Sequence, residues 1–159
     1  MTRAAVITVS DRSAEGARAD ASGPIAVSAL REAGFDCADA VVVHDGADSV
    51  ERALTAEVVA GVKLIVTTGG TGVSPRDQTP EGTARVVTRQ VPGIAEELRR
   101  RGAAEKPAGL LTRGIAGVVD PHGALVVNLP GSPGGVADGM PVVLSVALHV
   151  LDQLGGGDH

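Results

Sequence analysis

Residues 62–77 read VKLIVTTGGTGVSPRD, and this stretch decides the fold. Its apolar first part predicts a buried strand. The strand leads into residues 67–74, where three glycines and four Thr or Ser hydroxyls predict an anion-binding loop, here named the glycine cradle. Asp77 follows at once, and an acid beside a bound phosphate suggests a divalent cation. Thr79 and Pro80 suit the N-cap and first position of a helix, whose N-terminus also favours negative charge.

A bare Gly-Gly-x-Gly sequence is more often an ordinary turn between a strand and a helix. Here the strand, the glycines, the hydroxyls, the acid and the capped helix fall in one order, which favours a functional loop. The cradle lacks the Gly-Lys-Ser/Thr ending of a P-loop and the Gly-x-Gly-x-x-Gly spacing of a dinucleotide fold. Neither of those two mechanisms is therefore supported.

The rest of the chain alternates between strand-like and helix-like patterns. The expected strands are 4–9, 37–43, 62–66, 115–119 and 124–128, with the last two joined as a hairpin by the turn 120–123. The first two expected helices are 25–33 and 48–60, the latter with a capping box at 48–51. Two more begin at about Pro80 and at about Pro92, and the second of these ends in the solvated cluster 99–101. The last expected helix follows Ser132-Pro133, with Pro141 as a kink or restart. These patterns predict an α/β fold: one three-layer α/β/α domain over residues 1–154 with a mixed, mainly parallel sheet. The Gly-rich residues 155–159 are expected to be a disordered tail.

Ligands of open α/β sheets bind at the carboxyl ends of the strands. The loops 10–12, 44–46 and 128–132 follow expected strands, as the cradle does, so we expect all four to meet at one rim. Ser132 also suits the N-cap of the last helix, where unshielded glycine N–H groups would accommodate a second phosphate. Taken alone, the acids of these loops would be ordinary surface residues.

Composition limits the partners. A net charge of −5 and a single aromatic ring, Phe35, argue against nucleic acid. Cys37 is the only cysteine, so no intrachain disulfide can form and a zinc site is not expected. No run approaches the length of a membrane span, and the N-terminus leads straight into a strand. We therefore expect no membrane partner and a cytoplasmic location.

Four motifs resemble the MoaB/Mog family of molybdenum cofactor biosynthesis proteins. They are VSDR at 9–12, TTGGTGVSPRDQTPE at 67–81, LTRG at 111–114 and NLPGSPGG at 128–135, in family order over nearly the whole chain. One departure is Thr112, where related sequences often carry serine. The resemblance implies a molybdopterin adenylyltransferase, which converts ATP and molybdopterin to adenylyl-molybdopterin and pyrophosphate with Mg²⁺. It also implies a homotrimer and, as a further partner, a downstream molybdenum insertase.

The resemblance makes Asp45 and Asp77 the catalytic acids and the candidate metal ligands. Carboxylates can hold the Mg²⁺ that neutralises charge when two anions are joined. Asp77 is the better ligand candidate, and Asp45 is either a second ligand or a group that orients the nucleotide. The cradle is expected to take the pterin phosphate. The residues expected to bind substrate are Ser10, Asp11, Arg12, Thr68, Gly69, Gly70, Thr71, Gly72, Ser74, Thr112, Arg113, Asn128, Pro130, Gly131 and Ser132, with Arg12 and Arg113 as the anion contacts.

Two other interpretations stay open at this point. A catalytically silent member of the family would carry or protect molybdopterin without adenylating it, and the motifs alone do not exclude this. Related domains of longer chains hydrolyse nucleotide pyrophosphates or insert molybdenum. A length of 159 residues leaves no room for the additional domains of such chains.

Overall fold

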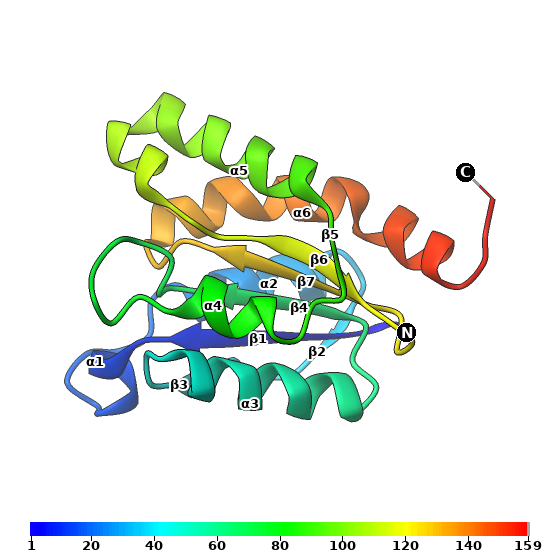
Figure 1. Ribbon diagram of the computed structural model, residues 1–159, viewed down its shortest axis with the longest axis horizontal. Coiled ribbons are helices and arrows are strands. Elements are labelled where there is room, and N and C mark those ends of the chain that lie inside the picture. The colour runs from blue at the N-terminus through cyan, green and yellow to red at the C-terminus, as the bar shows by residue number, and fades with distance from the viewer. Residues whose placement is uncertain (159) are drawn as a thin grey trace.

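Apolar side chains point to both faces of the central strands, which explains why helices cover the sheet on two sides. Ala4, Val6 and Val66 pack toward one set of helices, whereas Ile7 and Ile65 pack toward the other. This alternation has the two-residue period of a strand. In the computed structural model, which describes residues 1–158, it produces three layers (Figure 1).

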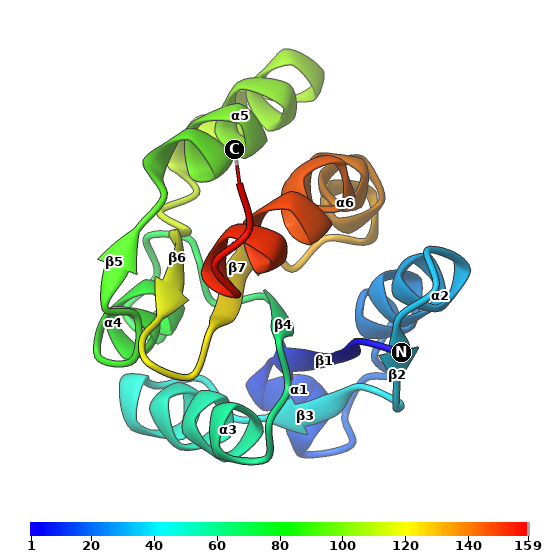
Figure 2. The ribbon, with the colours of Figure 1, turned by 90° about the vertical axis from the view of Figure 1, so that its right-hand side faces the viewer.

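The elements follow the chain in regular alternation. The strands are β1 Arg3–Val9, β2 Asp36–Cys37, β3 Val41–Val43, β4 Leu64–Thr68, β5 Arg89–Gln90, β6 Ala116–Val119 and β7 Ala124–Leu129. The helices are α1 Asp11–Ala14, α2 Gly23–Glu32, α3 Ala47–Val59, α4 Thr79–Ala84, α5 Pro92–Glu105, the 3₁₀ helix η1 Pro107–Leu111 and α6 Pro133–Leu154. Figure 2 shows α2, α5 and α6 on one side of the sheet and α3 and α4 on the other.

The sheet is mixed and mainly parallel, as predicted. Its order is β2-β1-β4-β7-β6-β5, with β3 also paired to β1. Strands β1, β2, β3, β4 and β7 are parallel, and the hairpin partner β6 and the short β5 are antiparallel to their neighbours. The parallel strands are buried on both faces because helices cover both sides.

Several local predictions were wrong. The expected strand 37–43 is divided into β2 and β3, and β5 was not expected. Helix α3 begins at Ala47 after Gly46, whose φ of +130° favours glycine, so residues 48–51 form no capping box. Thr79 lies inside α4 rather than at its N-cap. Helix α5 continues past the cluster 99–101 to Glu105.

Helix α6 is the longest element, with 22 residues, and it continues through Pro141. By length and composition it could pass for a membrane span, with a mean hydropathy of 1.5. This corrects the expectation that no run is long enough. In the fold, however, Val136, Met140, Val143 and Ala147 are buried against the sheet and its neighbouring helices. These contacts make α6 a core helix.

The chain after α6 turns back on the helix end. The N–H groups of Gly155, Gly156 and Gly157 donate to carbonyls of the last helical turn. The disorder expected for 155–159 is therefore not seen at these three glycines. His159 lies outside the described residues.

Candidate functional site

Four strand ends meet at one rim, as the sequence predicts. Thr8 of β1 pairs with Thr68 of β4, and Thr68 pairs with Leu129 of β7. Val43 of β3 pairs with the last residue of β1. The loops 10–12, 44–46, 67–74 and 130–132 consequently start from neighbouring points on the sheet.

The glycine cradle is tied to the rim by backbone contacts. Gly69 and Gly70 have φ values of +92° and +67°, which L side chains rarely adopt. Gly69 N–H donates to Leu129 O at 3.1 Å, and Thr79 Oγ1 donates to Gly69 O at 2.9 Å. The Thr79 hydroxyl therefore holds the cradle instead of capping α4. Within residues 1–158, the N–H groups of Gly70 and Gly72 form no hydrogen bond, and Gly70 lines the cavity described below.

Two carboxylates lie against the cradle backbone. A Cβ placed on Gly70 would lie 3.1 Å from Asp45 Oδ1, and one on Gly72 would lie 2.8 Å from Asp77 Oδ2. Asp77 Oδ2 also accepts the N–H of Ser74 at 3.1 Å. Burial is the main cause of a raised pKa at Asp45. The hydrogen bond from the Asp11 N–H lowers this pKa, whereas the negative charges of Asp11 and Asp77 raise it. A phosphate bound in the cradle without a cation would therefore lie beside two carboxylates, Asp45 and Asp77.

The Asp11 carboxylate is held by hydrogen bonds to neighbouring residues of the rim. Arg76 donates to it twice, from Nε at 3.0 Å and from Nη2 at 3.1 Å, and His44 Nδ1 lies 3.1 Å away. Asp11 and Asp45 also exchange hydrogen bonds, each accepting the other's N–H, at 3.0 and 3.1 Å. The Arg76 bonds are the largest reason that the pKa of Asp11 is lowered to about 2. This residue thus joins α1 to the loops that carry both catalytic candidates.

The lowered pKa of Asp11 predicts an acid-labile contact. Because the folded pKa of about 2 lies below the ordinary 3.8, the contact stabilises the fold above pH 4 and is lost as pH falls toward 2. We expect Asp11→Asn to lose less stability than the wild type across this window in urea unfolding. Asp39→Asn, at an exposed ion pair, should keep the wild-type profile. An equally steep acid loss in Asp11→Asn would contradict the assignment.

Two predicted binding residues, Arg113 and Asn128, form several hydrogen bonds to other parts of the fold. Arg113 donates from Nε to Gly72 O and from Nη2 to Asp77 O, both at 2.8 Å, and from Nη1 to Glu81 at 2.7 Å. It holds the cradle to α4, and its expected role as an anion contact stays a prediction.

Asn128 is buried at 3% exposure, and its amide group is fully used. Its Nδ2 donates to Thr67 and Thr83 hydroxyls at 2.9 and 3.0 Å, and its Oδ1 accepts the N–H of Ile115 at 3.1 Å. The amide holds β7 to β4 and α4, and a substrate contact of this residue stays a prediction.

The rim opens into a cavity of about 700 Å³, here named the rim cavity. Of the predicted site residues, those lining it are Ser10, Asp11, Arg12, Asp45, Thr68, Gly69, Gly70, Asp77, Gly131 and Ser132. Thr71, Gly72, Ser74 and Arg113 lie behind or beside this lining. Within residues 1–158, no three His, Cys, Asp or Glu side chains form a ready-made metal cluster.

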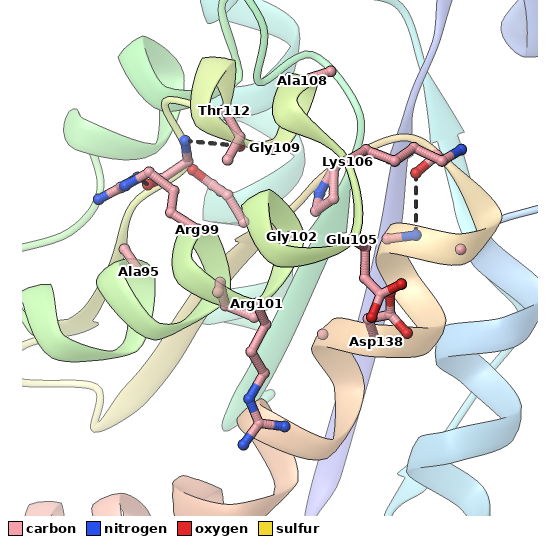
Figure 3. Close-up of a pocket in the computed structure, with 18 of the residues that line it drawn as sticks. Ala95, Arg99, Arg101, Gly102, Glu105, Lys106, Ala108, Gly109, Thr112 and Asp138 are labelled. Carbon is pink, nitrogen blue, oxygen red and sulfur yellow. Dashed lines mark hydrogen bonds between the residues drawn. The ribbon is translucent and has the colours of Figure 1, made fainter.

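A second cavity, of about 520 Å³, lies between α5, η1 and the start of α6 and is here named the helix cavity (Figure 3). Thr112, Asn128, Pro130 and Ser132 border it. So do Arg99 and Arg101, which the sequence analysis placed in a solvated cluster, and Glu105, Lys106 and Asp138, to which it gave no role. Ser132 and Pro133 line both cavities. Ser132 caps α6, accepting the N–H of Gly135 at 3.1 Å, so the N-terminus of this helix separates the two spaces.

Comparison with known proteins identifies the family. A family model described as a probable molybdopterin binding domain matches residues 5–150. The chain belongs to this family. It is 38% identical over 156 residues to the molybdenum cofactor biosynthesis bifunctional protein of Synechococcus elongatus, covering 98% of this chain and 48% of that relative. The chain thus spans about half the length of this curated relative.

Shorter relatives match over most of both chains. The chain is 35% identical to the molybdopterin adenylyltransferase of Pyrococcus furiosus, covering 92% of this chain and 87% of that one. The solved Mog protein of Mycobacterium ulcerans superposes with a TM-score of 0.90 and is 45% identical, covering 97% of this chain and 99% of that one. The resemblance to MoaB/Mog proteins and the three-layer fold are both confirmed.

Proposed function

We propose that this protein is a molybdopterin adenylyltransferase, which transfers AMP from ATP to the phosphate of molybdopterin and releases pyrophosphate. The observation that carries the proposal is the pair of cavities that share Ser132 and Pro133. The two substrates become joined through phosphate, so an enzyme for this reaction needs two binding spaces that meet at an anion site. Pro133 has no N–H and the Gly135 N–H donates to Ser132, so the Gly134 N–H and the positive end of the helix dipole would supply such a site at the start of α6.

The linings suggest which substrate each cavity takes. Six glycines border the helix cavity, at positions 102, 109, 114, 134, 135 and 139, and such small residues leave room for a flat bicyclic pterin. Its cationic side chains Arg99, Arg101 and Lys106 outnumber its acids Glu105 and Asp138, which favours a phosphate monoester. The rim cavity has Asp45 and Asp77 beside the cradle. We therefore place the pterin in the helix cavity and the nucleotide in the rim cavity, instead of the pterin phosphate in the cradle.

Asp45 and Asp77 fit the binding of Mg²⁺ together with a phosphate chain. Their carboxylates flank N–H groups that suit phosphate oxygens, and Mg²⁺ is commonly held by one or two carboxylates with the remaining ligands from substrate and water. When bound, the ion would neutralise charge on the reacting phosphates. This fit supports both acids in the roles that the resemblance implies.

The protein's own contribution to the reaction is orientation. An oxygen of the molybdopterin phosphate bonds to the α-phosphorus of ATP, and the bond to the bridging oxygen breaks, leaving its electron pair on pyrophosphate. The α6 N-terminus and the free cradle N–H groups would hold the two anions in line. Asp11 and Arg76 keep Asp45 in place, and Arg113 keeps Asp77 in place.

The rival proposal is a carrier that binds molybdopterin without adenylating it. Retention of both acids at the cradle favours the enzyme, and relatives of similar length are named molybdopterin adenylyltransferase. A homotrimer, a downstream insertase and a cytoplasmic location belong to the same proposal.

The deciding experiment is to incubate the protein with molybdopterin, ATP and Mg²⁺ and to measure pyrophosphate. We expect release that depends on the pterin. Pterin binding without pyrophosphate release would favour the carrier instead.

A further inference from the structure

The loop after β1 folds back on itself and brings two arginines together. Helix α1 is a single turn capped by Ser10, whose hydroxyl accepts the N–H of Ser13 at 3.2 Å. Gly16, with φ of +76°, then reverses the chain. The N–H groups of Ala17 and Arg18 both donate to Arg12 O, at 2.9 and 3.3 Å. Arg12 and Arg18 consequently start from adjoining backbone, and both line the rim cavity.

These two arginines carry charge that the surrounding acids do not neutralise. Neither forms an ion pair with any group in residues 1–158, whereas Arg76 and Arg113 are each bound to a carboxylate. Arg18 Nη2 instead donates to the Ser10 hydroxyl, a long contact of 3.4 Å at the end of β1.

The acids on their side of the cavity have other partners. Asp11 is held by Arg76, as described above. Asp20 accepts the N–H groups of Ser22 and Gly23, at 3.2 and 3.0 Å, and the hydroxyl of Thr8 at 2.7 Å. The lining of the rim cavity therefore includes two carboxylates at the cradle and, on the loop after β1, Asp20 together with two guanidinium groups that form no ion pair within residues 1–158.

We infer that Arg12 and Arg18 bind the β- and γ-phosphates of ATP and hold the pyrophosphate as it leaves; this rests on the proposed function. The carboxylates at the cradle and the arginines after β1 would orient a phosphate chain, with its metal-bound part at the carboxylates and its terminal part at the arginines. Negative charge develops on the leaving pyrophosphate when the bond to the α-phosphorus breaks. Guanidinium groups bind phosphate oxygens in pairs and stabilise that charge.

The inference is tested by titrating Mg²⁺–pyrophosphate, ATP and AMP into Arg12→Gln, Arg18→Gln and the double variant by calorimetry, without pterin. Each single change should weaken pyrophosphate and ATP binding by roughly tenfold or more, because a charge-assisted contact is lost. AMP lacks the terminal phosphates, so its affinity should stay unchanged. Arg18→Lys, which keeps the charge, should recover part of the lost affinity.

Arg52→Gln on α3 is the matched control, because Arg52 is exposed and does not line the rim cavity; its affinities should equal those of the wild type. Equal losses for AMP and pyrophosphate would overturn the inference, as would wild-type pyrophosphate affinity in the double variant. Pterin-dependent pyrophosphate release by the wild type tests the proposed function separately. If the wild type binds pyrophosphate through these arginines but releases none from ATP, the phosphate site is supported and the transferase proposal is refuted.

Discussion

Asp77→Asn is expected to lower pterin-dependent pyrophosphate release by roughly 10²–10³-fold, a loss comparable to that of a key electrostatic group in other enzymes. The change removes the charge needed beside a metal-bound phosphate. It should leave the cradle folded, because the amide oxygen can still accept the Ser74 N–H that Asp77 accepts at 3.1 Å. Molybdopterin should bind as before, since we place the pterin in the other cavity.

The measurement is pyrophosphate release at saturating Mg²⁺, paired with pterin binding and urea unfolding of the same variant. Asp39→Asn, whose side chain is 96% exposed, serves as the charge-matched control and should turn over like the wild type. Wild-type turnover in Asp77→Asn would place the metal elsewhere. A loss of pterin binding equal to the loss of turnover would show that the cradle is the pterin side after all.

Gly69→Ala is expected to have the largest effect on stability, a loss of about 3 kcal/mol or more. A Cβ at Gly69 would overlap the carbonyl oxygen of Val9, and the φ of +92° disfavours any L side chain. The Val9 carbonyl belongs to the backbone at the end of β1 and Gly69 follows β4, so neither residue can move without opening the rim.

Gly134→Ala provides the matched control. It lies in the first turn of α6, where nothing stands within 4 Å of an added Cβ, and alanine favours helix over glycine. We expect its unfolding midpoint in urea to equal or exceed that of the wild type. A Gly69→Ala protein as stable as Gly134→Ala would mean that the close approach of the two strand ends is not required.

Local patterns predicted the features that depend on neighbours in sequence. The order of strand and helix, the hairpin around residues 120–123 and the Ser132 cap all follow from period, turn residues and capping preferences, and the structure contains them. The meeting of four loops at one rim could also be predicted, because parallel strands end on the same edge.

The errors come from partners that are distant in sequence. Thr79 has the chemistry of an N-cap, but a carbonyl ten residues earlier takes its hydroxyl. The hydrogen bonds of Arg113 and Asn128, which the sequence places in binding motifs, also join distant partners, among them carbonyls, hydroxyls and a carboxylate of other elements. The helix cavity could not be predicted because it depends on α5 being longer than its Arg cluster suggested and on η1 folding back beside it.

Helix α6 has a consequence for how this protein is made. It lies between α2 and α5 in Figure 2 and covers apolar side chains of β4 and β7 from that side. All strands precede it in the chain, so the part of this face that α2 and α5 do not cover stays open to solvent until the 22-residue helix α6 has been synthesised. A ribosome that stops before residue 133 releases a chain with an uncovered sheet, the kind of apolar surface on which proteins aggregate. Completion of α6 is therefore the step that converts the nascent sheet into a folded protein.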